Sequence, residues 1–385
     1  MAMNQRIYLD HSATTPVRAE VFDAMLPYLR AQFGNAGSVH SFGREARRAV
    51  DDARDQVAAL VNAAPREILF TSGGTEADNL AVRGVVAASA RGRKRVVVSA
   101  VEHHAVLHAA ESLRGEGIEV VVVPVDSDGI VLLDALVEQI TDDTVLVSIM
   151  HANNETGAVQ PIGRIAALCE ERGIVFHTDA VQSAGKLSID VRRTPIGLLS
   201  ISGHKLYAPK GVGACYVRKG IDVMPQAVGG GQERERRAGT ENVAGIVGFG
   251  AACELARMEM QEVSARAAGL RDRLEREALA QSPDAIINAG GVERVPTISN
   301  IRFPGVDGES MVLALDVAGI AVSSGSACTA GSLDPSHVLL AMGQSYEIAQ
   351  SAIRFSLGRE TNELEIDSVV RALPDALQRA RSRAS

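Results

Sequence analysis

The sequence lacks long apolar runs and blocks of basic residues. No apolar stretch reaches the ~20 residues that a helix needs to cross a bilayer. The 39 lysines and arginines face 47 acidic residues, which gives a net charge of −8. We therefore expect neither nucleic acid nor an anionic membrane as the main partner. The opening MAMNQRIYLD has no basic or apolar signal region. This predicts a cytoplasmic protein.

Cysteine is scarce, and no CxxC pair is present. The thiols are Cys169, Cys215, Cys253 and Cys328. Such scattered cysteines argue against a disulfide framework and a zinc ribbon, so no metal centre is expected. The first three stand in apolar company (ALCEE, GACYV, AACEL), which predicts buried, inert thiols.

Lysine is equally scarce, so any lysine chemistry has few candidates. The five lysines are Lys94, Lys186, Lys205, Lys210 and Lys219.

What the 385 residues do contain is a regular alternation of short apolar runs and helical stretches. The length favours two domains. The runs are mostly continuous rather than alternating, as in strands buried on both faces, and they predict an α/β fold with helices on both faces of a sheet. The predicted strands are ILFT (68–71), RVVVS (95–99), EVVVVPV (119–125), TVLVSIM (144–150), IVFHT (174–178), LLSIS (198–202) and GACYV (213–217). One predicted helix, 162–173, ends at Gly173.

The pattern changes beyond Thr240. Long helices rich in Arg and Glu are expected up to about residue 280. A few strands and two further helices follow, which predicts a second domain.

The segment TSGGTEADN (71–79) follows a predicted strand and opens a helix. Gly73 and Gly74 let the backbone approach an anion, and the helix N-terminus favours a phosphate there. The alternative is an ordinary strand-to-helix turn in which Thr75 caps the helix and Asp78 is its box partner. No GK[ST] or GxGxxG motif accompanies the segment, so a nucleotide is disfavoured.

Two further residues stand at predicted strand ends. Asp179 in HTDAVQS could hold the ring nitrogen of pyridoxal phosphate (PLP) in its protonated form, although a capping or surface role is the commoner fate of a lone Asp. Lys205 in SGHKLYAPKGVGA has a partly apolar setting that suits imine formation. Its alternative is a solvated surface lysine.

In this order along the chain, the three elements resemble the fold-type-I PLP-dependent transferases of the class-V aminotransferase group. A closer likeness to cysteine desulfurases of the nitrogen-fixation and iron–sulfur-assembly type covers nearly the whole chain. It rests on YLDHSATTPV (8–17), TSGGTEADN, EHHAVL (102–107), NNETG (153–157), HTDAVQS, SGHKLYAPKGVG, RAGTENV (237–243), SSGSACTAGSLDPSHVL (323–339) and IRFSLGR (353–359).

The resemblance implies a large domain with a mostly parallel sheet (15–258) and a smaller α+β domain (1–14 and 259–385). Lys205 would hold PLP covalently, and His103 would stack on its ring and shuttle protons. Arg354 would bind the substrate carboxylate, as its planar guanidinium suits. The implied cofactor ligands are Gly74, Thr75, His103, Asn154, Asp179, Gln182, Ser202, His204, Lys205 and, from a second subunit, Thr240. Asn154 would also contact substrate.

Cys328 would separate a desulfurase from a transaminase. Its neighbours in SSGSACTAGS are small and polar, which predicts an accessible loop thiol. The resemblance implies that L-cysteine becomes L-alanine while Cys328 accepts the sulfur as a persulfide. The sulfur would pass to an acceptor or iron–sulfur scaffold protein, for clusters or other sulfur-containing cofactors. Cys328 would be a transient iron–sulfur contact at most.

Several alternatives stay open on the sequence. An aminotransferase or a selenocysteine lyase would share this fold, and a protein that only carries sulfur or docks partners could retain it. Lys205, Asp179 and Cys328 together argue against the last. The pair His104 and His108 has the i, i+4 spacing of some metal sites, but no further ligands accompany it, so a surface or capping role is expected.

Overall fold

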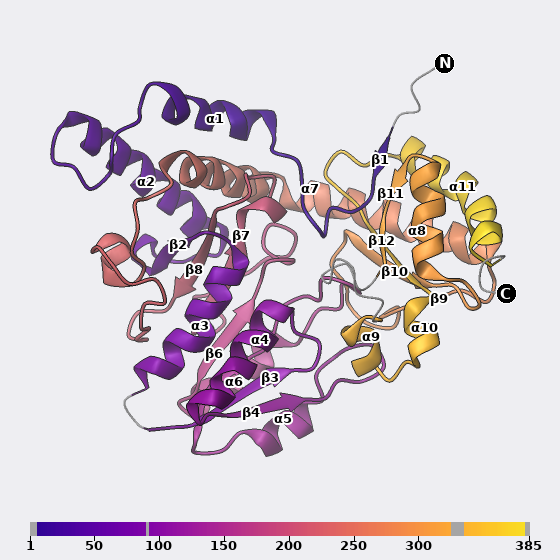
Figure 1. Cartoon of the computed structure of the whole chain (residues 1–385), viewed down its shortest axis with the longest axis horizontal. Coiled ribbons are helices and arrows are strands. Elements are labelled where there is room, and N and C mark those ends of the chain that lie inside the picture. Colours follow the sequence, from indigo (N-terminus) through magenta and orange to yellow (C-terminus); the bar gives the residue numbers. More distant parts are fainter. Residues whose placement is uncertain (1–5, 90–91, 325–334, 382–385) are drawn as a thin grey trace.

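A seven-stranded sheet forms the centre of the protein (Figure 1). The computed structural model describes residues 6–89, 92–324 and 335–381. All seven predicted strands are confirmed, with bounds shifted by a few residues at most. They are β2 (Ile68–Thr71), β3 (Arg95–Ser99), β4 (Glu119–Val123), β5 (Thr144–Ser148), β6 (Val175–Asp179), β7 (Leu198–Ser202) and β8 (Gly213–Val217).

The strand order is β2-β8-β7-β6-β5-β3-β4. Strand β8 runs antiparallel to both of its neighbours, and the other pairings are parallel. The carboxyl ends of the parallel strands therefore meet at one edge, where ligands of open α/β sheets bind.

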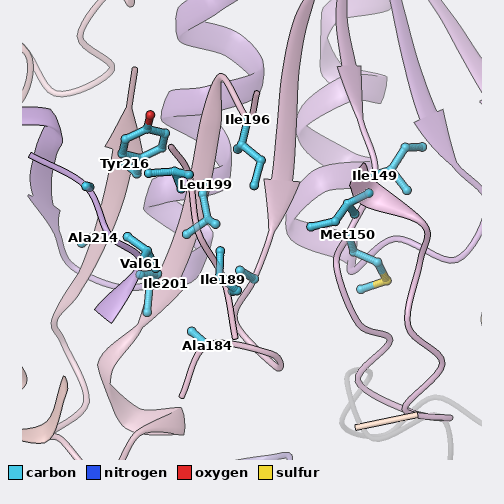
Figure 2. Packing of buried hydrophobic residues seen from close by; sticks show 14 of the residues in the cluster. Val61, Ile149, Met150, Ala184, Ile189, Ile196, Leu199, Ile201, Ala214 and Tyr216 are labelled. Carbon is cyan, nitrogen blue, oxygen red and sulfur yellow. The ribbon is translucent and has the colours of Figure 1, made fainter. Parts of the chain in front are cut away.

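Both faces of the sheet are covered, and alternate residues of each strand point to opposite faces. Val97 and Leu199 pack with helices α2 (Ser41–Leu60), α6 (Ile162–Glu171) and α7 (Val243–Gln281). Val96 and Leu198 pack with α3 (Gly74–Ala88) and α4 (His104–Ser112). Figure 2 shows part of the first cluster, including Leu199, Ile201 and Met150. This double burial explains why the runs are continuously apolar.

Helix α1 (Ala19–Arg30) packs on α7, and α5 (Leu133–Gln139) lies after β4. The predicted helix 162–173 is confirmed as α6, and Gly173 has the positive φ of +62° that stops a helix. The expected run of helices beyond Thr240 is one continuous 39-residue helix, α7.

A separate apolar cluster joins the chain's start to its end. Ile7 and Leu9 pack with the second half of α7, with β10 (Ile298–Arg302), β13 (Ala352–Ser356) and with α8 (Gly308–Val317) and α11 (Glu363–Arg381). Strands β9 (Ile286–Ile287) and β12 (Ser323–Ser324) complete its antiparallel sheet, and β1 (Ile7–Tyr8) pairs with β11 (Ile320–Ala321). The domain limits at residues 14 and 258 stay a prediction, since α7 runs through the second of them (Figure 1).

Two helices were expected after the strands, and the described residues hold four. The additional ones, α9 (His337–Ala341) and α10 (Tyr346–Gln350), are five residues each. Such short pieces carry no helical period, so the sequence gives little sign of them. None of the helices within the described ranges has the length and apolarity to cross a bilayer.

Candidate active site

A cavity of about 290 Å³ lies at the carboxyl edge of the large sheet. The loops after β2, β3, β5, β6 and β7 line it, and the segment after β1 and strand β13 close it from the other side. The structure brings together these predicted site residues: Gly74, Thr75, His103, Asn154, Asp179, Gln182, Ser202, His204, Lys205 and Arg354.

The N-terminus of α3 opens into this cavity. The helix begins at Gly74, and Gly73 at the N-cap gives no side-chain cap. A Cβ on Gly74 would lie 2.9 Å from Val181 Cγ2, so glycine is needed for the helix to start this close to the loop after β6. The alternative of a Thr75 cap with an Asp78 partner is wrong, because Asp78 is buried and lines the cavity. The free N–H groups of the first turn therefore face a site for an anion.

Asp179 ends β6 with its carboxylate buried in the cavity. The Val181 N–H donates to its Oδ1 at 2.8 Å. Burial raises the pKa of Asp179 to about 6, and the Lys205 ammonium acts in the opposite direction. Burial, and after it the charge of Asp179, raises the pKa of Asp78 well above its usual range. Of these two carboxyls, Asp78 thus holds the proton and Asp179 carries the charge.

Lys205 follows β7 in a single 3₁₀ turn, Gly203–Lys205. Its Nζ donates to the carbonyl oxygens of Ser12 and, at 2.6 Å, of Ala13. The amine is half-buried and lies between Asp179 and the N-terminal segment. Two carbonyls therefore fix the position of the amine.

His103 caps α4 and lines the cavity. Its Nδ1 accepts the Ala105 N–H at 3.1 Å. Burial, together with the nearby Lys205 charge, lowers the pKa of His103 to about 4. The ring is therefore neutral at neutral pH, and with Nδ1 accepting, its hydrogen is on Nε2.

Arg354 reaches the cavity from β13 in the small apolar unit. Its Nη1 donates to Asn154 O at 3.0 Å, and Nη2 pairs with Asp10 at 2.8 Å. The Nε group is buried, and none of the residues that the structure describes forms a hydrogen bond with it. Arg354 lines the cavity, and a planar guanidinium suits a ligand carboxylate.

Gln182, Ser202 and His204 occupy the rest of the wall. Gln182 Nε2 donates to Ser12 O at 3.0 Å. His204 Nδ1 lies 3.1 Å from Thr14 Oγ1, and burial lowers its pKa to about 4. Neutral His204 and the Ser202 hydroxyl, close to Gly74, can donate to a phosphate without competing for its charge.

Two predicted residues are not in this cavity. Thr240 is exposed on the segment before α7 and lines no part of it. Cys328 lies outside the described residues. The other three cysteines are buried as predicted. Burial raises the pKa of Cys169 to about 12 and also raises those of Cys215 and Cys253, so these thiols do not ionise at neutral pH.

Some groups that support the site had no role in the sequence analysis. The carbonyls of Ser12 and Ala13 hold Lys205, and buried Glu102 accepts the Met150 N–H at 2.7 Å, which fixes the turn before His103. Ser12 and Glu102 lie within YLDHSATTPV and EHHAVL, so the motifs were the available signal. Within the described part of the chain, no group of three His, Cys, Asp or Glu side chains is placed to hold a metal ion.

The chain resembles known proteins over nearly its whole length. The family model for class-V aminotransferases matches residues 7–369. A cysteine desulfurase IscS of Methanosarcina thermophila is 47% identical over 98% of this chain and 94% of its own, and a cysteine desulfurase of Nostoc sp. has the same identity and coverage.

Solved structures agree with these sequence matches. A NifS-like protein superposes with a TM-score of 0.91 at 36% identity, over 97% of this chain and 100% of its own. SspA in complex with cysteine superposes with a TM-score of 0.81 at 35% identity, over 92% of this chain and 99% of its own. The chain belongs to the class-V aminotransferase family. It is a PLP-dependent enzyme, and its curated relatives are cysteine desulfurases.

The residues of the cavity fit PLP. The α3 N-terminus with Ser202 and His204 suits the phosphate, and the charged, buried Asp179 suits a protonated ring nitrogen. Lys205 suits the aldehyde, and neutral His103 has a ring that can stack on an aromatic ligand. These assignments stay predictions, derived from chemistry and position.

Proposed function

We propose that the enzyme converts L-cysteine to L-alanine and transfers the sulfur to Cys328, for the synthesis of iron–sulfur clusters or other sulfur-containing cofactors. The observation that carries this proposal is the joint presence of buried Asp179, Lys205 and Arg354 around one cavity in a chain whose relatives are cysteine desulfurases. When bound, PLP supplies an electron sink for the bond broken at the substrate Cα.

Arg354 lines the cavity and binds the substrate carboxylate, and Asp10 and Asn154 hold the guanidinium in place. Lys205 Nζ takes the Cα proton, since Lys205 is the one lysine among the described residues that line the cavity. His103 is less suited to that role. Its acceptor nitrogen is occupied by Ala105 N–H, so Nε2–H instead donates to the substrate or cofactor.

The sulfur transfer is balanced without an external oxidant. The Cys328 thiolate forms an S–S bond with the substrate sulfur as the Cβ–S bond breaks. The bonding pair stays on Cβ, which takes up a proton, and alanine leaves. The persulfide on Cys328 then passes its sulfur to an acceptor or scaffold protein.

We also propose a cytoplasmic homodimer in which Thr240 completes the phosphate site of the partner. Large apolar side chains are exposed on and between α1 and α2: Phe22, Leu29, Phe33, Val39 and Phe42. Glu241, next to Thr240, pairs with Arg47 of α2 at 2.6 Å. This apolar surface and Thr240 are thus neighbours, which suits a shared interface.

Incubation of the purified protein with cysteine and a reductant tests the activity. Equal amounts of alanine and sulfide should form without a keto acid. Conversion of cysteine to 3-mercaptopyruvate only when a second keto acid is added as the amino acceptor would instead support an aminotransferase. Alanine release from selenocysteine but not from cysteine would support a selenocysteine lyase.

A further inference from the structure

A second, smaller cavity of about 60 Å³ lies behind Lys205. Ser12 and Lys205 line both cavities, so the amine lies between them. The inner cavity is formed by the N-terminal segment, the turn after β6 and the middle of α7, and its wall includes His11, Lys186 and Tyr207. None of these three has a role in the function proposed above.

Lys186 is placed there by the turn at Gly185. Gly185 has a φ of +71°, and a Cβ on it would lie 2.6 Å from Leu206 Cδ2. The Ser264 hydroxyl of α7 donates to Lys186 O at 2.9 Å and fixes the backbone. The Lys186 ammonium therefore points from a rigid turn into the region between the two cavities.

The cationic groups around Lys186 come from several elements. Lys205 follows β7 and Arg354 lies on β13. His11, which follows β1, adds no charge at neutral pH, because burial lowers its pKa to about 4. Of the described residues that line the inner cavity, Glu259 is the one acid, and Arg18 and Arg359 already pair with it at 2.8 Å each. Burial, with the Lys205 and Arg354 charges, lowers the pKa of Lys186 to about 7.

The contacts of Lys186 determine how the Gln182 amide is oriented. Lys186 Nζ donates to Gln182 Oε1 at 3.2 Å, and Gln182 Nε2 donates to Ser12 O at 3.0 Å. An ammonium can only donate and a backbone carbonyl can only accept, so both contacts require the same amide orientation. Without Lys186, Gln182 Oε1 would lose its donor, and the contact with Ser12 O alone would hold the amide.

We propose that Lys186 is a positioning residue, which fixes the Gln182 amide so that it presents N–H to the cofactor and adds a positive charge behind Lys205. This inference rests on the PLP site proposed above. Both effects disfavour protonation of the nitrogen that joins Lys205 to the cofactor. Neither effect requires Lys186 to contact the substrate.

The test is a pH titration of the visible absorbance of the bound cofactor. In Lys186→Met the pH at the midpoint of this titration should rise by about one unit. The substitution removes both the positive charge of Lys186 and the hydrogen bond that its Nζ donates to Gln182. Lys186→Arg keeps the donors and stays charged throughout the titration, so its midpoint should not rise above that of the wild type. Lys219→Met is the matched control. It removes an exposed lysine beyond the end of β8 that lies opposite the site.

An unchanged midpoint in Lys186→Met would overturn the inference and leave a packing role. If Lys186→Met does not fold, Lys186→Gln replaces it. Its titration midpoint must then rise by at least half a pH unit for the inference to stand. The titration needs only bound PLP. A wild type that binds PLP but releases no alanine or sulfide would overturn the proposed function alone, whereas an unchanged midpoint in an active enzyme would overturn the Lys186 inference alone.

Discussion

At the residue scale, Asp179 shows how a cofactor site is prepared at the expense of stability. Its pKa is raised from 3.8 to about 6 by burial. A carboxyl with a higher pKa in the folded than in the unfolded chain binds more protons when folded, so its contribution to stability is lost as the pH rises from about 4 through 6. Above that range the PLP-free protein holds an unfavourable buried charge.

Asp179→Asn should therefore stabilise the PLP-free protein at pH 8, by roughly 1–3 kcal/mol for a shift of about two pH units. This gain in stability should vanish near pH 4, because the Asp179 carboxyl of the folded wild type is then protonated and as neutral as the amide of the variant. The variant should also bind PLP more weakly, because an amide cannot stabilise a protonated ring nitrogen as a carboxylate does. Thermal melts at the two pH values check this, with exposed Asp142→Asn as the control. Equal melting temperatures of wild-type and Asp179→Asn protein at pH 8 would contradict it.

The sequence predicted Asp179, Lys205 and Arg354 but not the groups that orient them. A motif shows which side chain carries chemistry, since the residue type itself is informative. The carbonyls of Ser12 and Ala13 contact Lys205 across more than 190 residues of sequence, and Ser264 contacts Lys186 across 78 residues. No local pattern contains such contacts.

At the element scale, the segment between β8 and α7 is held by a buried ion pair. Glu233 accepts two hydrogen bonds from Arg54, at 2.7 and 2.8 Å, and a third from Phe70 N. The non-glycine residues Glu233, Arg234 and Glu235 all have positive φ, of 44°, 57° and 64°. Such residues cost about 1–3 kcal/mol each and persist where surrounding contacts fix them.

Glu233→Ala should lower the free energy of unfolding by about 3–5 kcal/mol, because it leaves a buried guanidinium and a buried N–H without their acceptor. Glu170→Ala is the control. It breaks the exposed pair with Arg218, which is worth about 0–1 kcal/mol. Denaturant melts measure both. A loss for Glu233→Ala no larger than for Glu170→Ala would show that the ion pair does not hold the segment.

The strands of the large sheet were predictable because burial on both faces makes them continuously apolar. The short helices α9 and α10 and the unbroken length of α7 were not. Helix α7 contacts the large sheet's core with one half and the small unit's core with the other, so its apolar side changes along its length and its period is blurred (Figure 1).

At the scale of the whole molecule, the site is proposed to need two chains. A mixed dimer of Lys205→Ala and Thr240→Ala subunits would place both lesions in one site and leave the other intact. Its activity should be about half that of the wild type, while each homodimer should be impaired. PLP binding in each site of the mixed dimer measures this. Affinity that follows only the mutation in the site's own chain would rule out a shared site.

The central claim is that Cys328 receives the sulfur, and mass spectrometry tests it most directly. Wild-type enzyme treated with cysteine and no reductant should gain one sulfur on the peptide that contains Cys328, with release of alanine. Cys328→Ser should still bind PLP and cysteine but lose alanine and sulfide production, because a hydroxyl is a far weaker nucleophile toward sulfur than a thiolate. The added sulfur on Cys169, Cys215 or Cys253, or near-normal turnover in Cys328→Ser, would contradict the account.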